Sequence, residues 1–157
     1  MPRITIESYV DVNTKEVEEL VSGAILKGLR DTIVAIHNDV VQLSPWKTAH
    51  NRRSIASEVS RMGTVIQGSE AEPEKVVDDS LDEAACYSTS GYGGYIEVGT
   101  APHVITVKNA KVLTDGKNFF GKTVNHPGTN PYPYFRPAFD MHKDELVENI
   151  KKHMEVK

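Results

Sequence analysis

The sequence predicts an α+β domain, and its apolar pattern gives the main evidence. Between residues 14 and 43, apolar side chains recur at intervals of three and four, which is the period of a helix. Between residues 54 and 124, short apolar runs alternate with turn residues, which is typical of antiparallel strands. A second helical pattern covers 137–154. We therefore expect one domain over residues 1–157, with a long N-terminal helix, an antiparallel β-sheet of several short strands and a C-terminal helix.

The first predicted helix has signals at both ends. Asn13 can cap its start, with Glu16 three residues later completing a capping box. Ser44-Pro45 marks its end, so the helix should be about 45 Å long at 1.5 Å per residue. Before the helix, Ile4 and Ile6 alternate with polar residues and predict a short strand.

A turn containing the only tryptophan of the chain follows the helix. We expect Trp46 to pack the helix end against the core, and the adjacent Arg52 and Arg53 to face solvent. His37 lies one position past an apolar residue of the helix, which predicts a partly exposed position at the edge of the buried face.

Turn residues divide the middle of the chain into short strands. The glycines at 91, 93 and 94 are expected to allow a bend or a close backbone approach, and not to bind phosphate, because no Gly-Lys-Ser/Thr follows them. Strands are expected at 54–67, as a pair meeting at Met62-Gly63, at 84–88, at 95–98, and between 104 and 124 around turns at Asn109-Ala110 and Asp115-Gly116-Lys117.

Negative charge is concentrated in one stretch, residues 69–85, which we call the acidic segment. It holds seven acidic residues and one lysine, a net charge of −6, while the whole chain carries −4. The remainder is only slightly basic, which does not predict sequence-specific binding to nucleic acid. With few large apolar side chains, the acidic segment should be a solvated insertion or a mobile loop.

Residues 126–137 contain four prolines and three aromatic rings. Proline fixes φ and removes a backbone donor, so this stretch should run extended and stiff until a helix begins near Pro137. Its rings need a surface to pack on, either in the subunit's own core or on a neighbour. We expect Phe135 in the core, because it stands beside the helix start, and Tyr132 towards a partner.

Chemical sites are weakly supported. No histidine pair has the i, i+4 spacing with a nearby glutamate that a zinc helix needs, and Cys86 is the only cysteine, so we expect no metal and no cofactor. No signal peptide or membrane-spanning run occurs, which predicts a cytosolic protein without membrane contact. One alternative stays open, a small cytosolic hydrolase that uses His103, His126 and Glu97.

Three segments in order resemble the tail-completion or head-to-tail joining proteins of long-tailed bacteriophages. They are Ser44-Pro45-x-x-Thr48 with residues 52–55, then residues 92–100 (YGGYIEVGT), then His126-Pro127-Gly128-Thr129 leading to residues 133–138 (PYFRPA). The similarity spans about residues 14–154, with Ala49 and Gly93-Gly94 departing from the usual pattern. The candidate interface or motif residues are Trp46, Arg52, Arg53, Glu97, Gly99, Thr100, His126, Pro127, Gly128, Tyr132, Tyr134, Phe135 and Arg136.

The resemblance implies a structural virion protein without catalysis, assembled in the host cytoplasm. Members of this family form a ring, commonly of six subunits, in the neck between the tail tube protein and the portal-connector complex. DNA passes through the lumen of such a ring without being read. The acidic segment would then face either a basic partner or the lumen. A third possibility is a cytosolic adaptor that binds an unrelated protein.

Overall fold

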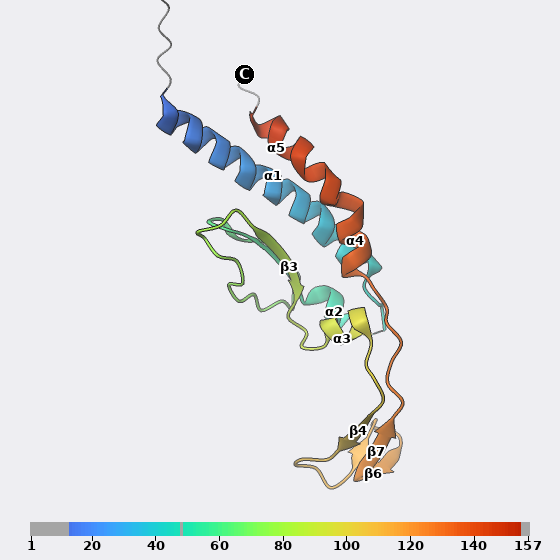
Figure 1. The fold of residues 1–157 in the computed structure, drawn as a ribbon. Coiled ribbons are helices and arrows are strands. Elements are labelled where there is room, and N and C mark those ends of the chain that lie inside the picture. Colours follow the sequence, from blue (N-terminus) through green and yellow to red (C-terminus); the bar gives the residue numbers. More distant parts are fainter. Residues whose placement is uncertain (1–12, 48, 155–157) are drawn as a thin grey trace, which may run out of the picture.

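The computed structural model describes residues 13–47 and 49–154, which adopt the α+β architecture that the sequence predicts (Figure 1). The strand expected at Ile4 and Ile6, and Thr48 of the first motif, lie outside the described residues. In chain order the elements are α1 (Thr14–Leu43), α2 (His50–Arg53), β1 (Ile55–Val59), β2 (Gly63–Gln67), β3 (Ala84–Ser88), α3 (Gly93–Val98), β4 (His103–Thr106), β5 (Leu113–Thr114), β6 (Phe119–Gly121), β7 (Thr123–His126), α4 (Phe135–His142), the 3₁₀ helix η1 (Lys143–Glu145) and α5 (Leu146–Met154).

Helix α1 begins and ends where the sequence predicts. Oδ1 of Asn13 accepts a hydrogen bond from the Glu16 N–H at 3.3 Å, and the Glu16 carboxylate accepts one from the Asn13 side-chain amide. The second bond joins two side chains, whereas a capping box would return to the Asn13 backbone. At the other end, the Ser44 N–H donates to the Val40 carbonyl at 3.0 Å. Pro45 follows and has no N–H with which to continue the helix.

The main sheet has the strand order β2-β1-β3 and is antiparallel throughout. Every residue of β1 is buried, because β1 is the central strand and α1 packs against it. The core cluster joins α1, β1 and the start of the C-terminal helices through Ile33, Ile36, Val40, Ile55, Val59, Tyr134 and Ala138. The sheet pairing meets the expectation for 54–67 and 84–88.

His37 is buried and does not lie at the partly exposed position that the sequence predicts. Its Nδ1 lies 3.0 Å from Oγ of Ser57 on β1, so the side chain links α1 to the sheet. Burial lowers the pKa of His37 below its ordinary value, because the charged imidazole would lose its hydration.

The C-terminal helix is divided and begins earlier than predicted. Instead of one helix over 137–154, α4 starts at Phe135, η1 tightens the chain, and α5 continues to Met154. Both α4 and α5 pack on α1, so that α1 lies between them and the sheet (Figure 1). Two histidine–aspartate pairs fix this packing, His142 with Asp39 at 2.7 Å and His153 with Asp31 at 2.8 Å.

The remaining strands form two separate antiparallel pairs, β4 with β7 and β5 with β6, instead of joining the main sheet. We call residues 101–133 the arm and the other described residues the body. In Figure 1 the arm extends away from α1, α5 and the main sheet. The expected turn at Asp115-Gly116-Lys117 connects β5 to β6. None of the residues 101–133 is buried.

Residues 95–98 belong to helix α3, whereas the sequence predicted a strand. An alternation of apolar and polar residues over only four positions does not distinguish a strand from one helical turn. The Ile96 N–H donates to the Tyr92 carbonyl, which is the i to i−4 bond of a helix.

The acidic segment packs in part against the main sheet, although the sequence predicted a solvated, mobile loop. Val77 is 5% exposed, and the Val76 N–H donates to the Glu58 carboxylate at 3.0 Å. The Tyr87 hydroxyl on β3 donates to the same carboxylate at 2.6 Å and also lies 2.9 Å from the Glu74 carbonyl. Composition does not predict these contacts, because they depend on one buried valine and on a carboxylate of a distant strand.

Candidate assembly interface

The root of the arm is a crossing of two backbone segments. Thr100 and Thr129 form an antiparallel bridge, with reciprocal N–H to carbonyl bonds of 3.0 and 3.1 Å. Gly99 and Gly128 flank this bridge with φ values of +71° and +88°. A Cβ on Gly99 would lie 2.5 Å from the Thr129 carbonyl oxygen, and one on Gly128 would lie 2.2 Å from that of Thr100. Glycine is therefore required at both positions, for its conformation and for its lack of a side chain.

Glu97, on helix α3, caps the start of helix α4, where the chain returns from the arm to the body. Its carboxylate accepts hydrogen bonds from the backbone N–H groups of Tyr134 at 2.7 Å, Phe135 at 2.9 Å and Arg136 at 3.1 Å. The first N–H groups of a helix have no partner within the helix, and the next residue, Pro137, has no N–H. One carboxylate thus satisfies every unpaired donor at this helix start.

The charge of Glu97 suits this position. Burial alone would raise its pKa, but the three backbone N–H donors, together with the charge of Arg136, outweigh burial and hold the pKa of Glu97 below its ordinary value. A negative charge is also favoured at a helix N-terminus by the helix dipole. Glu97 is therefore an ionised structural group that joins α3 to α4.

Tyr134, in the third motif segment, bonds directly to the second segment at Gly93 and reaches the first only through Asn51. Its side chain is fully buried, and its hydroxyl donates to the Gly93 carbonyl at 3.2 Å and accepts from the Asn51 side-chain amide at 3.0 Å. Phe135 packs against the core as expected but is only partly buried, and the fully buried ring is its neighbour Tyr134, with ring centroids 4.6 Å apart. Tyr132 is 56% exposed, and its expected contact with a partner stays a prediction.

Asn51 is a central residue that the sequence reasoning missed. It is buried, and its amide nitrogen donates to Oγ of Ser44 at 2.8 Å as well as to Tyr134. Its amide oxygen accepts from the hydroxyls of Ser88 at 2.7 Å and Ser90 at 2.8 Å. An asparagine in a polar turn carries no local signal of burial, because its partners come from distant parts of the sequence.

An open, mainly apolar groove of about 810 Å³ lies beside the arm root, and we call it the root groove. Exposed side chains of α3 and the arm line it, and His103 and His126 stand at its arm end with ring centroids 5.0 Å apart. Its lining includes the predicted residues Gly99, Thr100, His126 and Tyr132, together with Tyr92, Tyr95 and Val98. The structure thus brings the second and third motif segments together around one concave surface.

Trp46, Arg52 and Arg53 lie outside the root groove. Trp46 does not plug the core as predicted, because it is 72% exposed and the Arg52 guanidinium lies 4.3 Å from its ring centroid. Arg52 also donates to the Ser44 carbonyl at 2.6 Å, beyond the end of α1, and is only partly exposed. Arg53 is exposed and pairs with Glu70 at 2.6 Å. The arginines therefore fasten α2 to α1 and to the acidic segment.

The two remaining candidate interface residues, Pro127 and Arg136, have exposed side chains. Within the described ranges, no group of three or more histidine, cysteine, aspartate or glutamate side chains is arranged to hold a metal ion. Burial raises the pKa of the Cys86 thiol to about 11, which disfavours the reactive thiolate.

None of the helices between residues 13 and 154 combines the length and apolar character that crossing a bilayer requires. Comparison of the whole chain with protein-family models, curated proteins and solved structures gave no match.

Proposed function

We propose that this chain is a structural virion protein that completes the tail of a long-tailed bacteriophage and joins it, as a ring of subunits, to the head-connector complex. The order of the three motif segments supports this proposal. The second and third segments meet at the arm root, where Glu97 caps the helix that begins at Phe135, and Asn51 links Ser44 of the first segment to Tyr134 of the third. Motif residues that stabilise the base of a projecting arm suit an assembly protein better than an enzyme.

The observation that carries the proposal is the contrast between the arm and its surroundings. The arm consists of two-stranded pairs with no buried residue, and it exposes Val104, Phe119 and Phe120. A two-stranded ribbon is only marginally stable by itself in water. Such an arm gains stability by packing on another surface, and in a ring the neighbouring subunit supplies one.

The hydrolase alternative receives less support from the geometry. His103 and His126 do lie side by side across β4 and β7. The Glu97 carboxylate, however, already accepts three backbone hydrogen bonds, and its lowered pKa makes it a poor proton acceptor. An adaptor remains distinct from a ring protein in one measurable respect, since it need not self-associate.

Two measurements test the proposal. Sedimentation velocity of the purified chain over a wide concentration range should reveal a closed oligomer, and negative-stain electron microscopy should show rings, with six subunits expected. An antibody against the protein should label the head–tail junction of virions that contain it. A chain that stays monomeric at every concentration, or labelling elsewhere on the virion, would contradict the proposed role.

A further inference from the structure

The tip of the arm combines exposed aromatic rings with positive charge. Residues 117–122 read Lys-Asn-Phe-Phe-Gly-Lys, with Phe119 78% exposed and both lysines exposed. The arm as a whole holds four lysines and one aspartate, a net charge of +3, within a chain of net charge −4. Neither Lys117 nor Lys122 forms an ion pair with any described residue.

A groove in the acidic segment has the complementary character, and we call it the acidic groove. It measures about 470 Å³ and is lined in part by Glu72, Pro73, Glu74, Val76 and Tyr87. Within the described part of the chain, the Glu72 and Glu74 carboxylates have no ion-pair partner. Other acids of this segment are already paired within the subunit: Glu70 with Arg53, Asp79 with Lys75 and Asp82 with Arg61.

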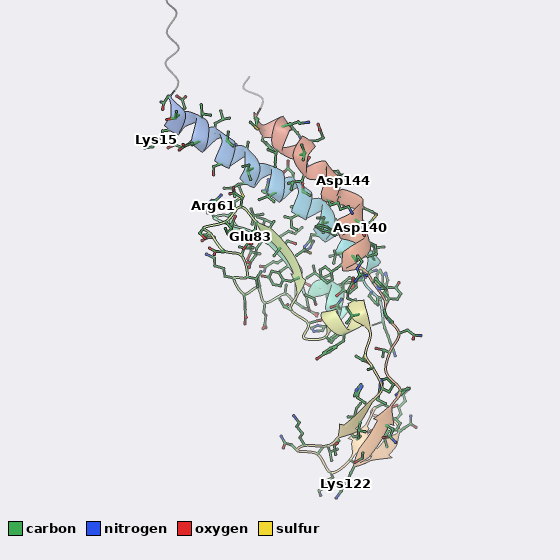
Figure 2. All side chains as sticks on the ribbon, in the orientation of Figure 1. Lys15, Arg61, Glu83, Lys122, Asp140 and Asp144 are labelled. Carbon is green, nitrogen blue, oxygen red and sulfur yellow. The ribbon has the colours of Figure 1, made fainter. Side chains whose placement is uncertain are left out.

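The tip of a subunit lies far from its own acidic groove. Figure 2 shows Lys122 at the far end of the arm, whereas Glu83, in the acidic segment, lies beside the main sheet. The glycine crossing at Gly99 and Gly128 and the Glu97 cap fix the direction in which the arm leaves the body. Contact between tip and groove therefore requires two copies of the chain.

We propose that the arm tip of one copy docks in the acidic groove of the next copy, with Lys117 and Lys122 facing Glu72 and Glu74. The exposed Phe119 would pack on the apolar part of the groove, formed by Pro73 and Val76. Opposite charges that frame an apolar contact favour one orientation and exclude others. This inference rests on the proposed function, because it assigns the contact by which the ring closes.

The acidic groove suits the tip better than the root groove does. The root groove is larger, but no acidic side chain lines it, so the two lysines would find no opposite charge there. Tip-to-groove docking is also a head-to-tail contact, in which each copy uses its tip once and its groove once. Contacts of this kind close into rings when the rotation between neighbours divides a full turn.

A pair of charge-reversal variants tests the contact. Lys117→Glu with Lys122→Glu makes the tip acidic, and Glu72→Lys with Glu74→Lys makes the groove basic. Each variant alone should self-associate roughly 100-fold more weakly than the unmodified chain, because like charges then face each other across the interface. A mixture of the two should recover association, since every tip again meets a groove of opposite charge. Sedimentation velocity at low and high salt measures this.

Two control variants change the net charge of the chain by the same amounts as the two test variants. Lys15→Glu with Lys152→Glu, and Glu18→Lys with Glu19→Lys, change exposed residues on α1 and α5 by the same charge and should leave association unchanged. The four control residues are exposed, so the melting temperature and the circular dichroism of both control variants should stay constant.

Each outcome decides the question. Recovery on mixing supports the docking. Variants that associate normally, or a mixture that fails to recover, overturn the docking while leaving ring formation in place. An unmodified chain that never associates overturns the proposed function and this contact together. If tip reversal abolishes binding to a duplex DNA fragment but leaves association intact, the tip is a nucleic-acid contact and the docking is wrong.

Discussion

The body and the arm of this chain are held together by different means. All ten buried apolar residues of the described chain belong to the body, and the arm from 101 to 133 has none. The body is stabilised by α1 packed between the main sheet and α4–α5, so its stability is its own. The arm depends on strand pairing and on the hydrogen bonds at its root. Substitutions should therefore affect folding in the body and association in the arm.

The largest expected effect is at Tyr134, where the body begins again after the arm. Tyr134→Ala removes a fully buried ring and should lower the free energy of unfolding by about 3–5 kcal/mol. Tyr132→Ala, two residues earlier but exposed, is the matched control and should change it by less than about 0.5 kcal/mol. Urea unfolding of both variants measures the difference. Equal losses would mean that the boundary between arm and body is drawn in the wrong place.

A smaller effect is expected at Glu97. Glu97→Gln removes the charge that accepts three backbone N–H bonds and should cost about 1–2 kcal/mol of unfolding free energy at pH 7. Because the folded-state pKa of Glu97 is lowered, its contribution is complete above the ordinary carboxyl pKa and is lost as the pH falls through the folded value.

The stability gap between the unmodified chain and Glu97→Gln should consequently narrow in acid. Urea unfolding at several pH values from 7 down to about 3 follows this gap, since the ordinary pKa of glutamate is about 4.3. A gap that stays constant or widens as the pH falls would show that the Glu97 charge does not stabilise the start of α4.

Substitution of Trp46 tests whether an exposed side chain of the body contributes less to the unfolding free energy than a buried one. Trp46→Ala removes an exposed ring and its contact with the Arg52 guanidinium, and should cost only about 0.5–1 kcal/mol. Thermal and urea unfolding give the value. A loss of several kcal/mol would instead support the core-packing position that the sequence suggests for this residue.

The smallest effect on folding is expected at the arm tip. Phe119→Ser should change the unfolding free energy by less than about 0.5 kcal/mol, because the ring is exposed in the single subunit. The same substitution should weaken self-association in sedimentation experiments. Met141→Ser, which alters an exposed apolar side chain on α4, should do neither and serves as the control. A clear loss of stability at Phe119 would show that the arm has a core of its own.

The body could be predicted from the sequence more fully than the arm root. The period of apolar residues predicted α1 from residue 14 to 43, and the turn at Met62-Gly63 predicted the pairing of β1 with β2. These signals are local, so a single sequence contains them. The sequence also predicted an extended stretch from His126 to Pro137, but its last three residues already belong to α4.

The root contacts could not be predicted because they join residues far apart in the chain. Asn51 and Tyr134 are 83 positions apart, and Glu97 and Tyr134 are 37 apart. Nothing local distinguishes Tyr134 from Tyr132 or Phe135, since all three stand among prolines. Residues 95–98 were misplaced for a related reason, because a single helical turn is too short to show a period.

The cap that Glu97 provides has a consequence for the evolution and engineering of this chain. It holds the start and the end of the arm within hydrogen-bond distance, whatever lies between them. The entropic cost of closing a flexible loop grows slowly, by about 0.6 kcal/mol for each doubling of its length. The segment between Pro102 and His126, which lies outside the Thr100–Thr129 bridge, can therefore be lengthened, shortened or exchanged with little loss of stability in the rest of the fold. The outer part of the arm is a modular insert, which can change while the body and the arm root are retained.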